Sequence, residues 1–201
     1  LTIAGGGSIS SANALMIDNT DSQLTVTGSS VLSGAKVTAP LTTGIVISES
    51  SAITTLTVGA LAPVAIAADK TLAGTVVINS EGTLMLTGSG SLDSAVALNG
   101  GTLDIDETLV INGAITHSAS SSIDVASGKV LTYSGAALSL GEHTLALTGG
   151  GTLSNTNPLS LDEASSVLNV AGPNTVSGPI ALNSGTLDID EDSVISGSIV
   201  Q

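Results

Sequence analysis

The sequence repeats itself at two scales, and this periodicity restricts its fold more than any other feature. Residues 96–115, VALNGGTLDIDETLVINGAI, closely match residues 180–199, IALNSGTLDIDEDSVISGSI, at an offset of 84 residues (96 to 180). Within that offset, an apolar-x-apolar element followed by a polar or glycine corner recurs every 19 to 23 residues. The element begins at Leu1, Leu24, Ile45, Val64, Leu84, Leu103, Ile123, Leu145, Leu168 and Leu187. Repeats of this length are typical of solenoids, in which stacked coils share one core.

Each repeat carries three strand signals separated by corners. In residues 168–186 these are LNV, a short element around Val176, and IAL. Period-two alternation places the apolar residues of each strand on one side and small polar residues on the other. We therefore predict an all-β parallel β-helix (β-solenoid), right-handed by the crossover rule, with about ten three-stranded coils and almost no helix. Residues 1–201 are expected to form a single domain, uncapped at both ends.

The composition predicts a thin interior and argues against nucleic acids and membranes as partners. Phe, Trp and Cys are absent and Tyr133 is the only aromatic residue, so the core must be thin and aliphatic. Three lysines and no arginine oppose 17 acidic residues, for a net charge of −14. A chain this acidic is repelled by nucleic acids and by anionic membrane surfaces. The uncharged run 52–68 alternates with period two and contains Gly59 and Pro63, so we expect strands there and no membrane insertion.

Asparagines mark a recurrent corner of the predicted coil. Asn79, Asn99 and Asn183 occupy equivalent places in their repeats. We expect Asn79 and Asn99, from adjacent coils, to stack. Asn tolerates the left-handed conformation of a sharp corner, and stacked amides can hydrogen-bond along the rod.

One coil resembles a known bacterial repeat. Residues 171–187, AGPNTVSGPIALNSGTL, resemble the autotransporter-associated β-strand repeat, whose usual form is close to L-x-x-G-x-N-T-Y-x-G-x-T-x-I-x-x-G-T-L. Matching positions are Gly172, Asn174, Thr175, Gly178, Leu182, Gly185, Thr186 and Leu187, and Val176 replaces the usual Tyr. The trio GTL recurs at Gly82, Gly101 and Gly151. The resemblance implies a passenger stem of a secreted or surface-displayed bacterial protein, often an adhesin, with no catalytic residues in the repeat.

Acidic clusters provide the candidate sites. The stretch LDIDE places Asp104 and Asp106 outward on one strand, and Asp124 occupies the place of Asp104 one coil later. These three carboxylates could hold calcium, which prefers several hard oxygens. The i, i+2 spacing of about 6.5 to 7 Å also suits an inverting glycosidase. However, no Trp, Phe or Arg is present to bind a sugar or a developing anion, and outward carboxylates commonly just solvate a β-face.

Other residues give weaker signals. His117 and His143 lie in different coils, and without Cys they do not indicate a zinc site. We expect His143, beside Glu142, to be an exposed corner. The T-x-T stretches at 25–27 and 55–57 could match an ice lattice, but the predicted register follows Thr25 with Val46, which breaks the row.

These patterns favour a structural, non-enzymatic extracellular β-solenoid: a stalk or filament segment of a bacterial surface adhesin. Its expected partners are itself, through end-to-end stacking or flanking repeats, and a glycan or protein receptor at a host or other surface. The alternatives are a calcium- or carbohydrate-binding surface module and, less favoured, a polysaccharide-degrading enzyme or an ice-binding protein.

Overall fold

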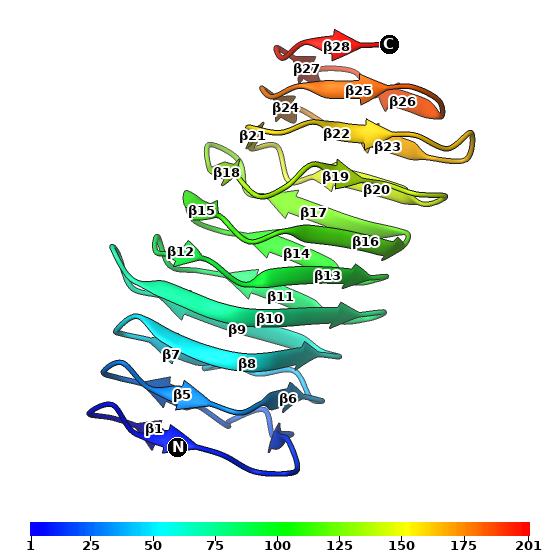
Figure 1. Ribbon diagram of the computed structural model, residues 1–201. Coiled ribbons are helices and arrows are strands. Elements are labelled where there is room, and N and C mark those ends of the chain that lie inside the picture. Colours follow the sequence, from blue (N-terminus) through cyan, green and yellow to red (C-terminus); the bar gives the residue numbers. More distant parts are fainter.

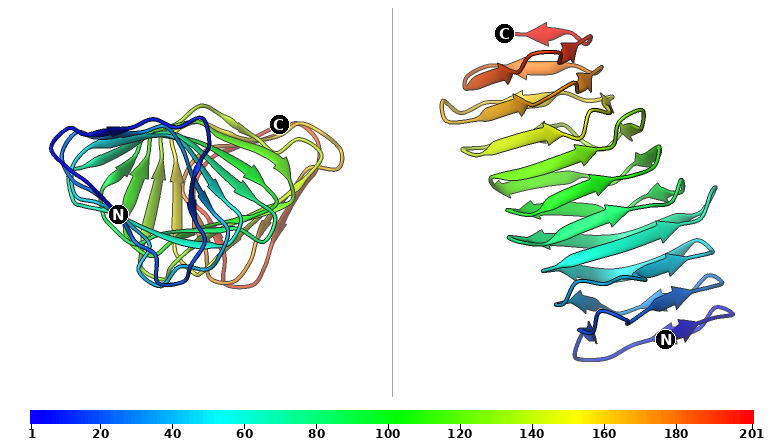
Figure 2. Two further views of the ribbon diagram at one scale, coloured as in Figure 1. Left: turned by 90° about the horizontal axis from the view of Figure 1, so that it is seen from below. Right: turned by 180° about the vertical axis from the view of Figure 1, so that it is seen from behind.

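The computed structural model describes residues 1–201 as a stack of coils built from parallel strands of 2 to 9 residues (Figure 1). The chain forms an all-β parallel β-solenoid of about nine turns with three parallel sheets, which confirms the predicted fold class. The right-handed winding stays a prediction. Seen from below, the coils overlap and their strands fan out from the N-terminal to the C-terminal end of the stack (Figure 2). The structure has no helix, and therefore none long and apolar enough to cross a membrane.

The first sheet contains one strand from every coil. Its order is β1 (Thr2–Ile3), β4 (Leu24–Val26), β7 (Ile45–Ile47), β9 (Leu61–Ile66), β11 (Thr83–Leu86), β14 (Thr102–Ile105), β17 (Ser121–Val125), β20 (Thr144–Thr148), β23 (Val167–Val170) and β26 (Thr186–Ile189).

The second face of the coil also has a strand in every turn. It comprises β2 (Ser8–Ile9), β5 (Val31–Leu32), β8 (Ser51–Val58), β10 (Thr71–Asn79), β12 (Ser91–Leu92), β15 (Leu109–Ile111), β18 (Val130–Tyr133), β21 (Thr152–Asn155), β24 (Thr175–Val176) and β27 (Val194–Ile195).

The third face is divided between two sheets. Its lower strands, β3 (Leu15–Ile17), β6 (Ala35–Val37), β13 (Ala95–Asn99) and β16 (Ile115–Ala119), join the second sheet through the long strands β8 and β10, which continue around the corner. Its upper strands, β19 (Leu138–Ser139), β22 (Leu159–Leu161), β25 (Ile180–Leu182) and β28 (Ile199–Val200), form a separate sheet. We call the interruption between β16 and β19 the seam.

The interior is a single aliphatic column, as the alternating pattern predicts. One cluster of 44 buried apolar residues extends along the stack. In β14, for example, Leu103 and Ile105 are fully buried, whereas Thr102 and Asp104 face outward and are partly exposed. Each coil therefore buries its inward residues against the coils above and below.

Two register predictions are wrong by two residues. Val64 pairs with Leu86 rather than Leu84, and Ile123 pairs with Leu147 rather than Leu145. The other residues that are predicted to begin a repeat and lie within strands pair with their predicted partners in the next coil, as Leu103 does with Ile123. A shift of two residues keeps every side chain on its own face of the strand, so the alternation cannot reveal it.

The asparagine prediction is confirmed in register and wrong in conformation. Asn79 pairs with Asn99 in neighbouring strands. The non-glycine residues with positive φ are instead Asp69, Glu81 and Asp192, in the turns that follow strands or strand-like segments. The Asn99 side chain accepts a 2.6 Å hydrogen bond from the Ser118 hydroxyl, so its amide bonds to serine in the next coil rather than to another asparagine.

Candidate functional sites

Two carboxylates stack directly on the outer surface of the first sheet. Asp104 in β14 pairs with Asp124 in β17, as the sequence predicted. They are the only two like-charged residues in register anywhere in the strand ladders. The Thr148 hydroxyl, one coil further on, donates a 2.6 Å hydrogen bond to Asp124 Oδ2. Burial, together with the nearby charges of Asp106 and Asp124, raises the pKa of Asp104 to about 6.

Asp106 does not complete a three-carboxylate cluster. It follows the end of β14, and its backbone N–H donates to Leu86 O at 3.0 Å in the coil below. No group of three or more His, Asp or Glu side chains in the chain is arranged to hold a metal ion. Calcium binding by Asp104, Asp106 and Asp124 stays a prediction, and its structural basis is a pair of carboxylates.

The other acidic side chains that form ion pairs or hydrogen bonds do so with neutral or cationic partners in an adjacent coil. Ion pairs join Lys70 to Glu49 at 2.7 Å and Lys129 to Glu107 at 2.6 Å. Amide side chains donate to carboxylates in three further pairs: Asn112 to Asp93 (2.7 Å), Asn183 to Asp162 (2.8 Å) and Asn169 to Asp188 (3.1 Å). These contacts connect successive coils on the outside of the rod while keeping negative charges apart.

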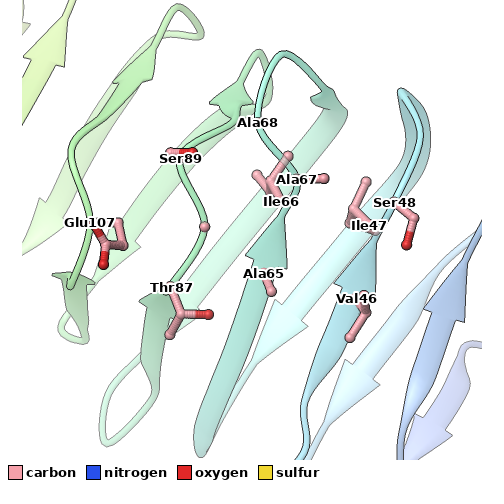
Figure 3. Close-up of a pocket in the computed structure, with 11 residues that line it drawn as sticks. Val46, Ile47, Ser48, Ala65, Ile66, Ala67, Ala68, Thr87, Ser89 and Glu107 are labelled. Atoms are coloured by element: carbon pink, nitrogen blue, oxygen red, sulfur yellow. The ribbon is translucent and has the colours of Figure 1, made fainter.

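The first sheet also carries a shallow surface hollow of about 330 Å³ (Figure 3). Small outward side chains such as Ala65 and Ala67 form its floor, and Val46 and Thr87 border it. Its one ionisable lining residue, Glu107, is the partner of Lys129. The hollow therefore brings together no pair of ionisable groups that could act as acid and base.

The ring-bearing side chains gather at the seam, which sequence reasoning missed. The rings of His117 and His143 lie edge to face with centroids 5.7 Å apart. Tyr133, the largest fully buried side chain, reaches the same level of the stack from β18. His143 is half-buried and not the exposed corner predicted above. The two histidines are 26 positions apart in the sequence, and this separation did not indicate that they meet, because their proximity depends on how the coils stack.

Side chains replace main-chain hydrogen bonds at the seam. On either side of it, backbone N–H groups donate directly to the next coil, as from Val96 to Ala114 (2.8 Å) and from Leu138 to Pro158 (3.0 Å). The Ile115 N–H instead donates to the Tyr133 hydroxyl at 3.1 Å. That hydroxyl donates in turn to Ala136 O at 2.6 Å.

His117 makes the second side-chain link across the seam. Its Nδ1 lies 3.1 Å from Leu140 O. A carbonyl can only accept, so Nδ1 carries the proton. Nε2 is buried and has no hydrogen-bond partner. Burial lowers the pKa of His117, and His143 acts in the same direction, while the carbonyls of Leu140 and Thr144 oppose them.

The last coil exposes apolar side chains that the preceding coils bury. Ile189 and Ile199 are 44% and 47% exposed, whereas their register partners Val170 and Ile180 in the coil below are fully buried.

Comparisons with protein-family models, with curated proteins and with solved structures give no match. The class that the structure defines is the parallel β-solenoid.

Proposed function

We propose that this chain is a structural rod: a stalk or filament segment of an extracellular, surface-displayed adhesin of the autotransporter passenger type, without catalytic activity. The observation that carries the proposal is the regular stack of coils, in which one aliphatic column and parallel strand ladders run from coil to coil. In a solenoid each coil buries its inward residues only against neighbouring coils, so a coil of the same kind is the partner that fits it.

The expected partner is a coil of the same kind, either from a second copy stacked end to end or from flanking repeats of the same polypeptide. The resemblance of residues 171–187 to passenger repeats supports the extracellular setting.

The test compares two exposed apolar residues of the last coil. Ile199→Lys places a charge in the inward row, whereas Val194→Lys alters an outward position, because Val194 pairs with the outward Thr175. We expect the unmodified chain and Val194→Lys to form longer rods as concentration rises, in steps of roughly 45 Å by electron microscopy. Ile199→Lys should stay a single short rod by sedimentation.

Two results would contradict end-to-end stacking. One is a chain that stays a short monomer at the highest soluble concentration. The other is assembly that Val194→Lys blocks as strongly as Ile199→Lys does. Labelling of intact producing cells with an antibody against the rod tests the surface location separately.

A further inference from the structure

The seam differs from every other level of the third face. Above it, the N–H groups of Leu138, Leu159 and Ile180 each donate directly to a carbonyl of the next coil, at 2.8 to 3.1 Å. Between β16 and β19 there is no paired register and no direct backbone hydrogen bond. The two coils are joined there by Tyr133 and His117.

The other two faces stay continuous at this level. β17 pairs with β20 in the first sheet, and β15 pairs with β18 on the second face. Loss of the side-chain links would therefore open one face of the coil without separating the two halves of the rod. Such an opening is a local hinge.

His117 lies in line with apolar side chains of the coils below, so its position favours a neutral side chain. It pairs with Leu98 in the preceding coil, and Leu98 pairs in turn with Ile78. Leu98 and Ile78 are both fully buried. A neutral imidazole fits this row and bonds to Leu140 O through Nδ1. A second proton would go to Nε2, which is buried without a hydrogen-bond partner, and the centroid of the His143 ring lies 5.7 Å from that of the His117 ring. Burial makes the added charge costly despite the carbonyls of Leu140 and Thr144, and a charge on the neighbouring His143 would add like-charge repulsion.

We propose that the seam is an acid-sensitive hinge, in which protonation of His117 opens the third face between β16 and β19.

The ionisable groups around His117 do not offset the added charge. The turn before β20 contributes His143 and Glu142, and the equivalent turn one coil on contributes Asp162 and Glu163. Tyr133 comes from β18, and its pKa is raised by burial, so it stays neutral. β13 and β19 contribute no ionisable side chain. No carboxylate is among the groups that shift the pKa of His117.

Amide hydrogen exchange by NMR tests the hinge on the whole chain. The reporter is the Ile115 N–H, which bonds to Tyr133 across the seam. Its matched control is the Leu159 N–H, which donates to Pro179 O at 3.1 Å on the same face. Between pH 7.5 and pH 5.0 we expect the protection factor of Ile115 to fall at least tenfold and that of Leu159 to stay constant. Measurements in an Asp104→Asn background remove the carboxylate that titrates in the same range.

Two further measurements connect the opening to the histidine. His117→Leu restores the residue type of Leu98 and should abolish the acid response of Ile115. In the Asp104→Asn chain, the ring signals of His117 should titrate with the same midpoint as the loss of Ile115 protection. The proposal is overturned if Ile115 and Leu159 respond alike, if the two midpoints differ, or if His117→Leu keeps the full response.

Discussion

The hydroxyl of Tyr133 takes the place of a backbone acceptor for Ile115, at the one level where the third face lacks a direct bond between coils. The ring fits because Gly135 has no Cβ, which would lie 2.8 Å from the hydroxyl oxygen and 2.4 Å from Gly113 O. The single aromatic residue of the chain is thus used to bridge an interruption in the ladder.

We expect Tyr133→Phe to destabilise the fold by about 1 to 3 kcal/mol, because Ile115 N–H and Ala136 O both lose a buried partner. Denaturant unfolding measures this loss. The control is Ser139→Ala, an exposed change in β19 that should shift stability by less than about 0.5 kcal/mol. Equal midpoints for Tyr133→Phe and the unmodified chain would show that the relay contributes nothing.

Asp104→Asn should stabilise the protein above pH 6. The pKa of Asp104 is raised from 3.8 to about 6 on folding, so the folded state holds its proton more tightly than the unfolded state. The resulting penalty is absent below pH 3.8, grows as pH rises toward 6, and is constant above it. Because the group is partly exposed, we expect a gain of only about 1 kcal/mol at pH 7.5 and none at pH 3.5.

Thermal unfolding at the two pH values checks this difference, with Asp188→Asn as the control because Asp188 pairs with Asn169 rather than with another acid. Added calcium should reduce the gain from Asp104→Asn if the cation neutralises the pair. A gain that is the same at both pH values would mean that the carboxylate charge is not its cause.

Gly74→Ala should be strongly destabilising. Gly74 lies in a bulged part of β10 with φ +123°, and a Cβ there would lie 1.8 Å from the backbone oxygen of Ile53. Overpacking and backbone strain together predict a loss of about 3 kcal/mol. Gly34→Ala is the matched control, since its Cβ would meet nothing closer than 3.6 Å. Similar denaturant midpoints for the two variants would refute the clash.

Glu81→Asn should stabilise the turn between β10 and β11. Glu81 has φ +68°, a region that costs most L-residues about 1 to 2 kcal/mol and that Asn tolerates better. We expect a gain of about 0.5 to 1 kcal/mol in unfolding experiments. Glu142→Asn, another exposed glutamate but without positive φ, should give no gain, and a gain of equal size there would indicate a charge effect instead.

The candidate sites show which contacts the alternation of apolar and polar residues can predict and which it cannot. The alternation correctly placed Asp104 and Asp124 outward and in register, because the intervening 20 residues contain no two-residue slip. It did not bring His117 near His143, because His117 lies in β16 and His143 in the turn before β20, and the two meet only where successive coils stack at the seam. Small register errors leave the face of each side chain unchanged but alter its neighbours along the rod.

The linear sequence was sufficient for the coil: strand alternation and corner residues act over a few neighbouring positions, so the fold class, the thin aliphatic core and the outward carboxylates follow from it. Register, the left-handed turns at Asp69, Glu81 and Asp192, and the gathering of Tyr133, His117 and His143 at the seam came from the folded stack. These features depend on contacts between residues about 20 positions apart, where packing and hydrogen bonding between coils select among alignments that the alternation leaves equivalent.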